Sequence, residues 1–404
     1  MTLDDARALD AADPLRSFRD RFVLPEGVIY LDGNSLGPLP RATAQRIAQV
    51  TRHEWGEGLI RSWNDAGWVD APLRVGAKIA RLIGAAAGEV AVADSTSVCL
   101  FKLVMAAAGL RDGAILAERD NFPTDLYIAE RAAALLGRPF RAVPAEKIGD
   151  ALTPDVAVAV LTHVDYRSAA KADMPGLGAR AAANGTRVVW DLSHSVGAVP
   201  LDLRADGVEL AVGCGYKYLN GGPGAPAFLY VAQALQSLLQ PPVAGWWSHA
   251  APFDFADHYA PAPGIARFLS GTPPVLGLAA LESGVELMLD ADPARLWRKA
   301  ASLWNVFVDE VARTCPTLEL RTPRDPTRRG SHVALRHPHA LAIVRALIAR
   351  GVIGDFRTPD IARFGFAPLY LAHEDVWRAA EQLGQVMENE EWADPSFARG
   401  GLVT

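Results

Sequence analysis

The stretch GCGYKYLNGGPG, residues 213–224, decides the fold of this 404-residue chain. Lys217 lies in it between two tyrosines, just before a glycine-rich turn. In a second stretch, VVWDLSHSVG (188–197), Asp191 directly follows three apolar residues. Such a run is typical of a buried strand that presents its next side chain at the edge of a pocket. The two stretches therefore offer an amine and a carboxylate to one site.

An amine and a carboxylate are the two groups that pyridoxal phosphate requires from a protein. Lys217 can hold the aldehyde of this cofactor as a Schiff base. Asp191 can keep the pyridine nitrogen protonated, so that the ring acts as an electron sink. The alternative is that Asp191 only ends a strand, that Lys217 lies on the surface, and that the two never meet.

The phosphate of such a cofactor needs backbone N–H donors and hydroxyl groups at the start of a helix. Ser95, Thr96 and Ser97 precede a helical apolar pattern over residues 98–108. Helix N-termini bind anions through their free amides and the helix dipole. A simple helix cap is the alternative, but together with the lysine and the aspartate this segment predicts a phosphate site.

The segment DNFPTDLY (120–127) marks another junction between a strand and a helix. Phe122 can stack on a planar ring, and Asp125 can bond to that ring or cap the helix. Trp55, Trp63 and Trp68 crowd a second segment, and Trp246 and Trp247 are adjacent in the sequence. Core packing explains most tryptophans, but such clusters beside glycines, in expected loops, favour a pocket for an aromatic ligand.

Composition excludes several classes of protein. Half of the residues (50%) are hydrophobic, 21% are charged and the formal net charge is −6, so no basic footprint for nucleic acid is expected. The sequence contains no apolar run of about 18 residues, so no membrane span is expected. The N-terminal stretch lacks the apolar core of a signal peptide, so a cytoplasmic protein is expected.

Cysteine and histidine spacing argues against metal and disulfide sites. Cys99, Cys214 and Cys315 are far apart and form no CxxC pair, which suits a reducing compartment. The sequence places three further candidates close together, and we expect them to lie in a loop rather than to bind metal: His332, His337 and His339.

The middle of the chain alternates apolar strand-like runs with helical spacers. This pattern predicts parallel βαβ units in an α/β domain with both sheet faces covered. The segments that carry the pattern are residues 156–161, 179–183, 187–190 and 210–212.

At this length two domains are expected. We place a large domain at residues 46–284 and a smaller α+β domain at 285–404, with residues 1–45 packed against the smaller one. In the C-terminal part the sequence predicts helices over 339–351 and 373–390.

Taken together, the segments resemble the kynureninase family, whose members are pyridoxal-phosphate enzymes of fold type I in the aspartate aminotransferase superfamily. The resemblance spans about nine-tenths of the chain. It rests on YLDGNSLGPLP (30–40), HEWGEGLIRSW (53–63), DSTSV (94–98), NFPTD (121–125), DLSHSVG (191–197), GYKYLNGGPG (215–224), GWWSH (245–249) and RFGFAPLYLAHEDV (363–376).

The resemblance implies a large domain with a mostly parallel seven-stranded sheet, and it implies roles for particular residues. Lys217, Tyr216 and Asp191 would be catalytic. The same three would contact the cofactor together with Thr96, Ser97, Phe122, Pro123, Thr124, Asp125, Thr162, His194, Trp246 and Thr272. The substrate would be bound by Arg363, which would grip its α-carboxylate, and by Trp63, Asn34 and Ser35.

The implied reaction is hydrolysis of L-kynurenine to anthranilate and L-alanine, in a homodimer with shared active sites. The bulky Trp63 favours L-kynurenine over its 3-hydroxy derivative. Tryptophan catabolism and NAD biosynthesis both remain possible contexts.

Two other functions remain open on the residues alone. A cysteine desulfurase or selenocysteine lyase of the same fold would need a reactive thiolate, for which Cys315 is the only candidate. A protein that only binds or regulates would not need both Asp191 and Arg363.

Overall fold

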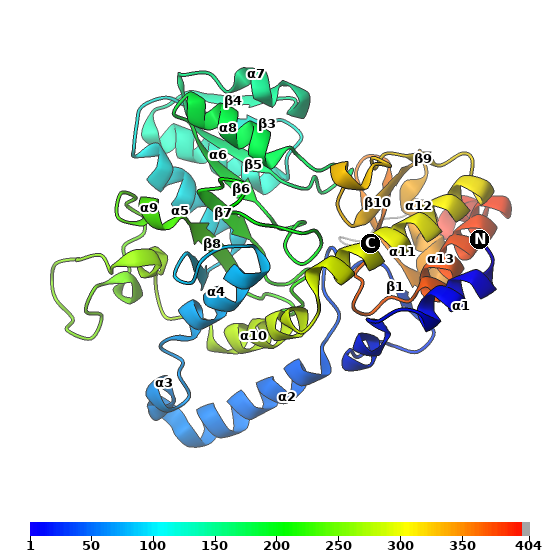
Figure 1. Ribbon diagram of the computed structural model, residues 1–404, viewed down its shortest axis with the longest axis horizontal. Helices are drawn as coiled ribbons and strands as arrows, with labels where there is room; N and C mark the ends of the chain where they lie inside the picture. The colour runs from blue at the N-terminus through cyan, green and yellow to red at the C-terminus, as the bar shows by residue number, and fades with distance from the viewer. Residues whose placement is uncertain (398–404) are drawn as a thin grey trace.

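A seven-stranded sheet forms the centre of the larger part of the molecule in the computed structural model, which describes residues 1–397 (Figure 1). Strand β8 runs antiparallel to both of its neighbours, and the other neighbouring pairs are parallel. The predicted mostly parallel sheet is therefore confirmed. The strands lie in the order β2 (Val90–Ala93), β8 (Ala227–Val231), β7 (Leu210–Gly213), β6 (Arg187–Asp191), β5 (Val156–Thr162), β3 (Ala114–Glu118) and β4 (Phe140–Val143).

The sheet separates two hydrophobic layers because its strands are apolar on both faces. On β5, Val158 and Val160 point into one layer, whereas Ala159 and Leu161 point into the other. This alternation follows from the two-residue repeat of a strand. One layer contains helices α5 (Thr96–Ala108) and α6 (Pro123–Leu136), and the other contains α4 (Ala71–Leu82), α8 (Met174–Ala183) and α10 (Val275–Leu289).

A four-stranded antiparallel sheet forms the smaller part of the molecule. Its order is β12 (Asp355–Arg357), β13 (Ile361–Gly365), β10 (His332–Arg336) and β9 (Glu319–Leu320). Its helices are α11 (Pro293–Thr314), α12 (Ala340–Ala349) and α13 (His373–Glu388). The smaller C-terminal α+β unit is therefore confirmed.

The expectation that His332 lies in a loop is wrong. His332 is the first residue of β10 and is fully buried, because β10 is an inner strand of the sheet that is covered on both faces. His337 and His339 do lie in the turn that follows the strand. No group of His, Cys, Asp or Glu that could hold a metal ion occurs within residues 1–397.

The N-terminal segment packs against the C-terminal elements, as the blue and red ribbons of Figure 1 show. Strand β1 (Ile29–Tyr30) pairs in parallel with β11 (Val352–Ile353), and α1 (Leu3–Ala11) contacts α13. The division of the chain into two domains stays a prediction, and its proposed boundary at residue 284 falls inside α10.

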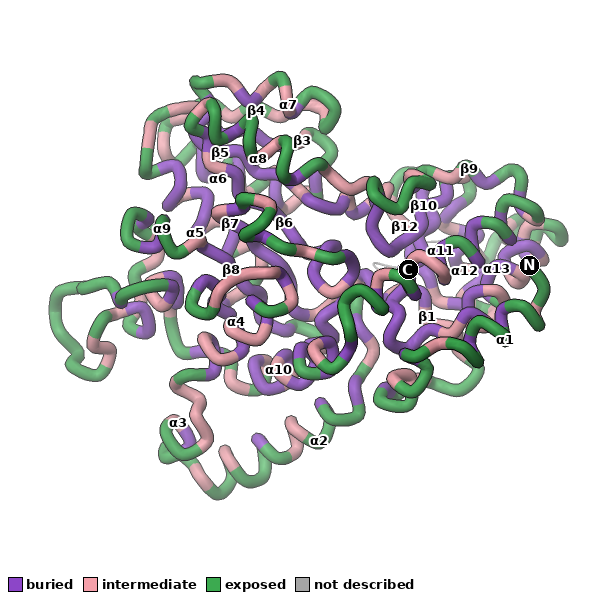
Figure 2. Tube along the Cα trace, in the orientation of Figure 1, coloured by how far each residue is buried: buried purple, intermediate pink, exposed green. Residues whose placement is uncertain are grey.

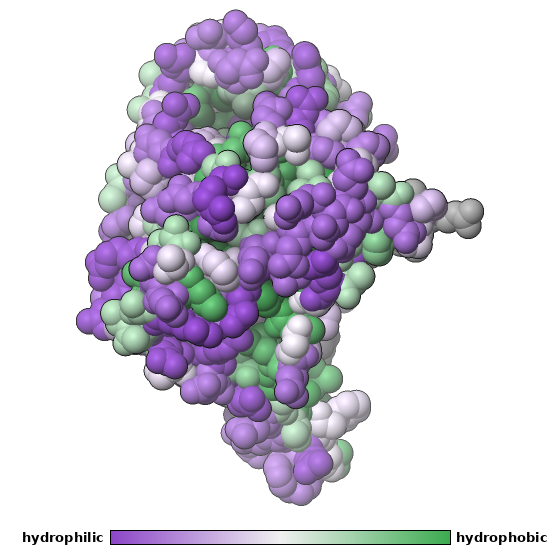
Figure 3. Space-filling view, turned by 90° about the vertical axis from the view of Figure 1, so that its right-hand side faces the viewer, coloured by the Kyte–Doolittle hydropathy of each residue, from purple (hydrophilic) through white to green (hydrophobic). Residues whose placement is uncertain are grey.

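Residues 41–65 project from the body as an arm. The arm consists of α2 (Arg41–Gln49), a π-helix (Val50–Gly58), a short 3₁₀ turn (Leu59–Arg61) and α3 (Ser62–Asp65), and it is mostly exposed (Figure 2). The expectation of a loop around Trp55 and Trp63 is thus wrong, because the segment is helical. Seen from the side of the smaller part, hydrophobic residues gather in the hollow above this arm (Figure 3).

The remaining helices within residues 1–397 are short. They are Arg16–Arg21, Ala145–Lys147, α7 (Ile148–Ala151), α9 (Gln233–Gln236), Trp246–Ser248, Gly264–Phe268, Pro326–Arg328, Glu391–Ala393 and Pro395–Phe397. No helix in this part of the chain combines the length and apolar character that crossing a bilayer requires.

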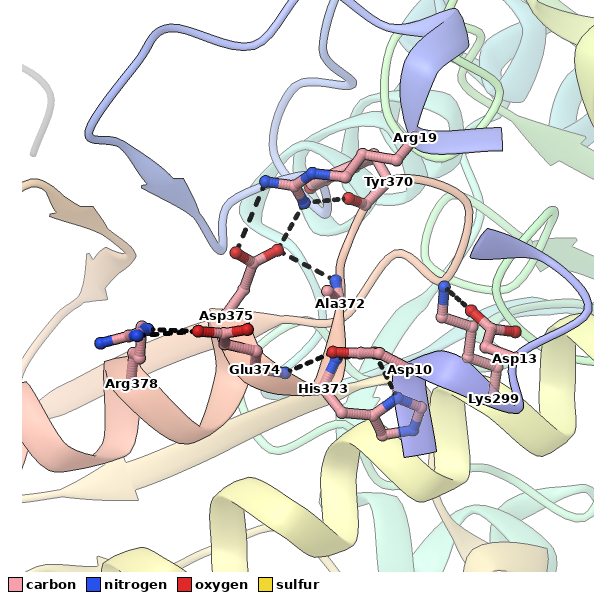
Figure 4. A network of polar contacts seen from close by, with 10 residues as sticks. All are labelled: Asp10, Asp13, Arg19, Lys299, Tyr370, Ala372, His373, Glu374, Asp375 and Arg378. Carbon is pink, nitrogen blue, oxygen red and sulfur yellow. Dashed lines mark hydrogen bonds and ion pairs between the residues drawn. The ribbon is translucent and has the colours of Figure 1, made fainter. Parts of the chain in front are cut away.

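One carboxylate of α1 caps a helix at the other end of the chain (Figure 4). Asp10 accepts hydrogen bonds from the backbone N–H groups of His373 and Glu374, at 2.7 and 2.9 Å, where α13 begins. Its Oδ1 also lies 2.9 Å from Nδ1 of His373. Burial opposes ionisation of Asp10, but these hydrogen bonds prevail and lower its pKa below the usual value.

Two further ion pairs hold the same segment (Figure 4). Lys299 Nζ lies 2.6 Å from Asp13 Oδ2, and both side chains are almost fully buried. Arg19 bonds to the Asp375 carboxylate and to the backbone carbonyl of Tyr370. These contacts tie the first residues of the chain to α11 and α13.

We predict that Asp10→Ala lowers the free energy of unfolding by about 1–2 kcal/mol, since it removes a helix cap and leaves buried donors without acceptors. Because the folded-state pKa of Asp10 is depressed, its contribution is present above the unfolded pKa and is lost as the pH falls through the folded one. Chemical denaturation at pH 7 and at pH 3 measures both effects.

The matched control is Asp4→Ala, which removes the same charge from an exposed position of α1. It should change stability by no more than a few tenths of a kcal/mol, as expected for a surface ion pair. Equal losses in the two variants would contradict a capping role for Asp10.

Candidate active site

A cavity of about 330 Å³ opens where the parallel strands of the large sheet end. Most of the residues that the sequence indicated meet there, although they come from distant segments. The predicted residues that line the cavity are Thr96, Ser97, Phe122, Thr124, Asp125, Thr162, Asp191, His194, Tyr216 and Lys217. The lining also includes Asp94, Ser95, Tyr166, Ser193, Gly224 and Ala225.

Strand register explains why these side chains meet. Thr162 is the last residue of β5 and pairs with Asp191, the last residue of β6, while Asp191 pairs with Val212 on β7. Because parallel strands end at the same edge, the three loops that follow them surround one space. Lys217 lies in the loop after β7 and therefore faces Asp191's end of the sheet.

A neutral histidine contacts the amine of Lys217. The Lys217 Nζ lies 2.9 Å from Nε2 of His194, which is almost fully buried. Burial, followed by the positive charge of Lys217, holds the pKa of His194 well below its usual value. A neutral imidazole can accept a hydrogen bond from an ammonium group, so His194 can orient Lys217.

Two carboxyl groups lie together at the floor of the cavity. Asp191 accepts a hydrogen bond from the Ser193 N–H at 2.6 Å. Asp125 is fully buried beside it, and burial together with the Asp191 charge raises the pKa of Asp125 well above its usual value. This shift favours the protonated form of Asp125, and α6 receives no side-chain cap. The capping role that the sequence left open for Asp125 is not observed.

The start of α5 forms one wall of the cavity. Ser95 is its N-cap residue and accepts from the Val98 N–H at 3.4 Å. Asp94 precedes it in a left-handed conformation (φ 46°), a strained state for a residue other than glycine. The fully buried Lys102 holds this conformation through an ion pair of 2.6 Å with Asp94 and a bond of 2.7 Å to the Phe268 carbonyl.

An aromatic ring stands at the cavity and is open to solvent. Phe122 is 44% exposed, and its ring lies perpendicular to that of Tyr166, with centroids 5.3 Å apart. Thr162 donates its hydroxyl hydrogen to the side-chain oxygen of Asn121, which fixes the neighbouring loop. Phe122 is therefore available to stack on a planar group.

The N-terminal segment reaches the loop that carries Lys217. The Gly37 N–H donates to the Tyr216 carbonyl at 2.9 Å. A Cβ atom at Gly37 would lie 2.4 Å from the Lys217 carbonyl oxygen, so only glycine permits this approach.

Arg363 does not line the cavity, and most N–H groups of its guanidinium already donate hydrogen bonds within the protein. It is almost completely buried and donates from Nε to Asp355 Oδ1 at 2.8 Å and from Nη2 to Ser35 Oγ at 2.8 Å. Asp360, an acid only three positions before Arg363, bonds instead to Arg336 at 2.6 Å. Arg363 is therefore paired, but with a buried rather than a surface acid.

The remaining predicted residues also lie outside the cavity in the single chain. Trp63 packs against Trp68 and Trp247, with ring centroids 5.6 and 5.1 Å apart. Trp246 and Thr272 are exposed. Asn34 is fully buried, and its side-chain amide has no hydrogen-bond partner within residues 1–397. The other two are Ser35 and Pro123, and Pro123 is the first residue of α6.

Sequence reasoning missed several residues near the cavity. Asp355 and Arg357 are two positions apart on one strand, and Asp355 lies opposite Arg363 in the register of β12 and β13. Alternation along GDFR could have indicated that they share a face. No local sequence signal would have indicated Tyr166, since its partners Phe122 and Arg363 are distant in the chain.

A larger groove of about 1080 Å³ lies beside the cavity and shares Thr162 with it. It extends between α8 and the C-terminal sheet and contains neither Lys217 nor Asp191. The smaller cavity is therefore the candidate active site, because it alone of the two brings the amine and the carboxylates together.

Comparisons with known proteins agree with this geometry. A family model described as the kynureninase C-terminal domain matches residues 296–383. A protein from Burkholderia pseudomallei (strain 1106a) named kynureninase is 49% identical over 417 residues, covering 100% of both chains. A kynureninase from Pseudomonas fluorescens is 47% identical over 414 residues, again covering 100% of both chains.

Among solved structures, the apo structure of a cysteine desulfurase from Thermococcus onnurineus NA1 has a TM-score of 0.79 and 17% sequence identity. The match covers 92% of this chain and 98% of that chain, and at such low identity it shows the fold alone. Identity close to one half along the full length of two kynureninases is a much stronger relation, and it shows that this chain belongs to the kynureninase family.

Proposed function

We propose that this protein is a pyridoxal-phosphate enzyme that hydrolyses L-kynurenine to anthranilate and L-alanine. The observation that carries the proposal is that one cavity contains Lys217, Asp191 and the start of α5, in a member of the kynureninase family. We place the reaction in tryptophan breakdown, and the three unpaired cysteines suit a reducing, cytoplasmic setting.

The residues of the cavity fit the cofactor. Lys217 supplies the amine for its aldehyde, Asp191 the carboxylate for its ring nitrogen, and Thr96 and Ser97 the hydroxyl and N–H donors for its phosphate. Phe122 would cover the ring. When bound, the cofactor withdraws electrons from the substrate so that bonds at Cα and between Cβ and Cγ can break.

The protein's own groups would hold and move the protons. Asp191 would keep the proton on the ring nitrogen, and Asp125, whose protonated form is favoured by burial, can donate a hydrogen bond to Asp191. Lys217, once released from the cofactor, can take the proton from the substrate Cα, while His194 positions its amine.

Tyr216 is the candidate proton donor for the second half of the reaction. Burial raises its pKa above the usual value, so its hydroxyl stays protonated at neutral pH. It can then donate to the γ-carbonyl oxygen when water adds there. If Tyr216 contacted only the phosphate, another group would have to donate this proton.

A desulfurase reaction is not favoured by the thiols of this chain. Cys99, Cys214 and Cys315 are all buried, and none of them lines the cavity. Burial raises the pKa of each thiol, to about 12 for Cys99, whereas that chemistry needs an accessible thiolate. We therefore infer no desulfurase activity from the structural similarity to cysteine desulfurases, whose sequence identity to this chain is low.

We further propose a homodimer in which each active site uses residues of both subunits. Trp246 and Thr272, which we expect to contact the cofactor, and Trp63, which we expect to contact the substrate, lie outside the cavity of their own chain. The arm nearby carries exposed apolar side chains, including Trp55 and Ile60 at 59% and 76% exposure. Such a surface suits burial against a second copy.

The function is tested by steady-state kinetics with L-kynurenine and its 3-hydroxy derivative, following anthranilate fluorescence for the former. We expect L-kynurenine to have the higher kcat/KM, because the bulky Trp63 leaves less room for a hydroxyl group. Lys217→Ala should abolish turnover, since it removes both the cofactor attachment and the base.

A matched control is Lys171→Ala, which alters a lysine of the neighbouring groove and should retain wild-type turnover. Borohydride reduction of the yellow protein should fix the cofactor on Lys217, as peptide mass spectrometry can show. A label on another lysine, or no chromophore after adding pyridoxal phosphate, would refute the cofactor assignment.

We predict that Asp191→Asn lowers kcat by several orders of magnitude, because the ring nitrogen loses the charge that keeps it protonated. The expected increase in the barrier is about 3 to 6 kcal/mol. Asp125→Asn should lower kcat by no more than about tenfold, since it replaces one neutral hydrogen-bonding group by another. Near-normal turnover in Asp191→Asn would show that another group pairs with the ring.

Shared active sites predict complementation between two inactive variants. Lys217→Ala and Trp246→Ala are first shown to be inactive alone, then unfolded and refolded together. Random pairing in a two-fold dimer should restore about a quarter of the wild-type activity, since half of the dimers contain one intact site. Activity that stays at the level of the separate variants would place Trp246 in its own chain's site or outside both.

A further inference from the structure

Two guanidinium groups share one buried carboxylate on the small-sheet side of the cavity. Asp355 Oδ1 accepts from Arg363 Nε at 2.8 Å, and its Oδ2 lies 2.7 Å from Arg357 Nη2. Ser35, which lies 320 positions earlier in the chain, donates to the same Oδ2 at 2.6 Å. The Asp355 side chain is only 2% exposed, so these contacts replace its hydration.

The two arginines differ in how many donors they have left. Arg363 is 1% exposed, and its Nε–H, both N–H groups of Nη2 and one of Nη1 are taken by Asp355, Ser35 and the Tyr166 carbonyl. Arg357 is 32% exposed, and its Nε makes no hydrogen bond to any residue of the described chain, 1–397. Arg357 thus has donors free for a ligand.

The cluster holds more positive than negative charge near neutral pH. Burial opposes the ionisation of Asp355, but Arg363 and then Arg357 prevail and lower its pKa. The second carboxyl group of the cluster is Asp32, where burial and the Asp355 charge raise the pKa to about 7. Two guanidinium groups therefore face one full and one partial negative charge. An anionic ligand would balance them, since an uncompensated buried charge is costly.

The cluster also lies next to the candidate active site. Arg363 donates to the carbonyl of Tyr166, whose side chain lines the cavity. Burial raises the pKa of Tyr166, and the charge of Arg357 is among the groups that oppose this shift. Burial and then the charge of Lys217 lower the pKa of His194, and Arg357 adds to that shift. His332 lies on the same face of the sheet as Arg363 and packs 5.3 Å from the His194 ring, with neither of its buried nitrogens bonded.

We propose that Arg357 is a second guanidinium of the substrate-carboxylate subsite, acting together with Arg363. Arg357 supplies free N–H groups to the α-carboxylate of the amino acid, and Asp355 is a positioning residue that holds both guanidinium groups. The inference rests on the proposed function, in that the amino end of the substrate is directed to Lys217. A charged fork is the protein group that best matches a carboxylate.

The test compares ligands with and without a carboxylate in Arg357→Gln, loaded with pyridoxal phosphate. L-alanine and ethylamine are titrated separately, and binding is followed by the change in cofactor absorbance. The variant should bind L-alanine about tenfold or more weakly, since a charged hydrogen bond contributes about 1.5–3 kcal/mol, and should bind ethylamine as the wild type does. The KM for L-kynurenine should rise in parallel, with kcat within about threefold of wild type.

Two further variants separate a direct role from a structural one. Arg336→Gln makes the same change at an exposed arginine of β10 and should leave both affinities unchanged. Arg357→Lys keeps the charge but loses the fork, so it should restore part of the affinity for L-alanine. Thermal unfolding of each loaded variant checks that the fold is intact.

The possible outcomes are distinct. Equal losses of affinity for L-alanine and ethylamine in Arg357→Gln, or no loss for either, would overturn the inference. If the wild type fails to hydrolyse L-kynurenine but loses L-alanine affinity selectively in Arg357→Gln, the proposed function fails and the carboxylate subsite stands.

Discussion

The in-register parallel pairing of β5, β6 and β7 is the constraint on which the rest of the structure depends. It brings the last residues of β5 and β6, Thr162 and Asp191, to the same level and directs the following loops into one space. Lys217 reaches this space only because its loop follows β7. The two hydrophobic layers cover both faces of these strands and bury them within the sheet.

Buried charges then give each part of the site its electrostatic character. The Lys102–Asp94 pair holds the loop before α5 in a left-handed conformation. Beside Asp191, burial and the Asp191 charge raise the pKa of Asp125 and favour its neutral form. Next to the cavity, Asp355 binds two guanidinium groups, so the cavity is acidic around Asp191 and its surroundings on the side of the small sheet are basic.

The site also requires both ends of the chain. The N-terminal segment crosses to the loop of Lys217 through Gly37, and Ser35 from the same segment bonds to Asp355. That segment is in turn held by Asp10 at the start of α13 and by β1 beside β11. The N-terminal segment therefore contacts both the loop of Lys217 and the Asp355 cluster.

The sequence by itself determined the fold class, and it indicated the lysine, the aspartate and the helix start that the structure brings to one cavity. These features depend on local patterns, because a run of apolar residues or a helix start can be recognised from a few neighbouring residues. Tertiary structure alone decided that the tryptophan-rich arm is helical, that His332 is buried in a strand, and that Arg363 pairs with Asp355 rather than Asp360. Such outcomes depend on strand register and on partners hundreds of residues away, as Ser35 and Asp355 are, and no local pattern specifies them.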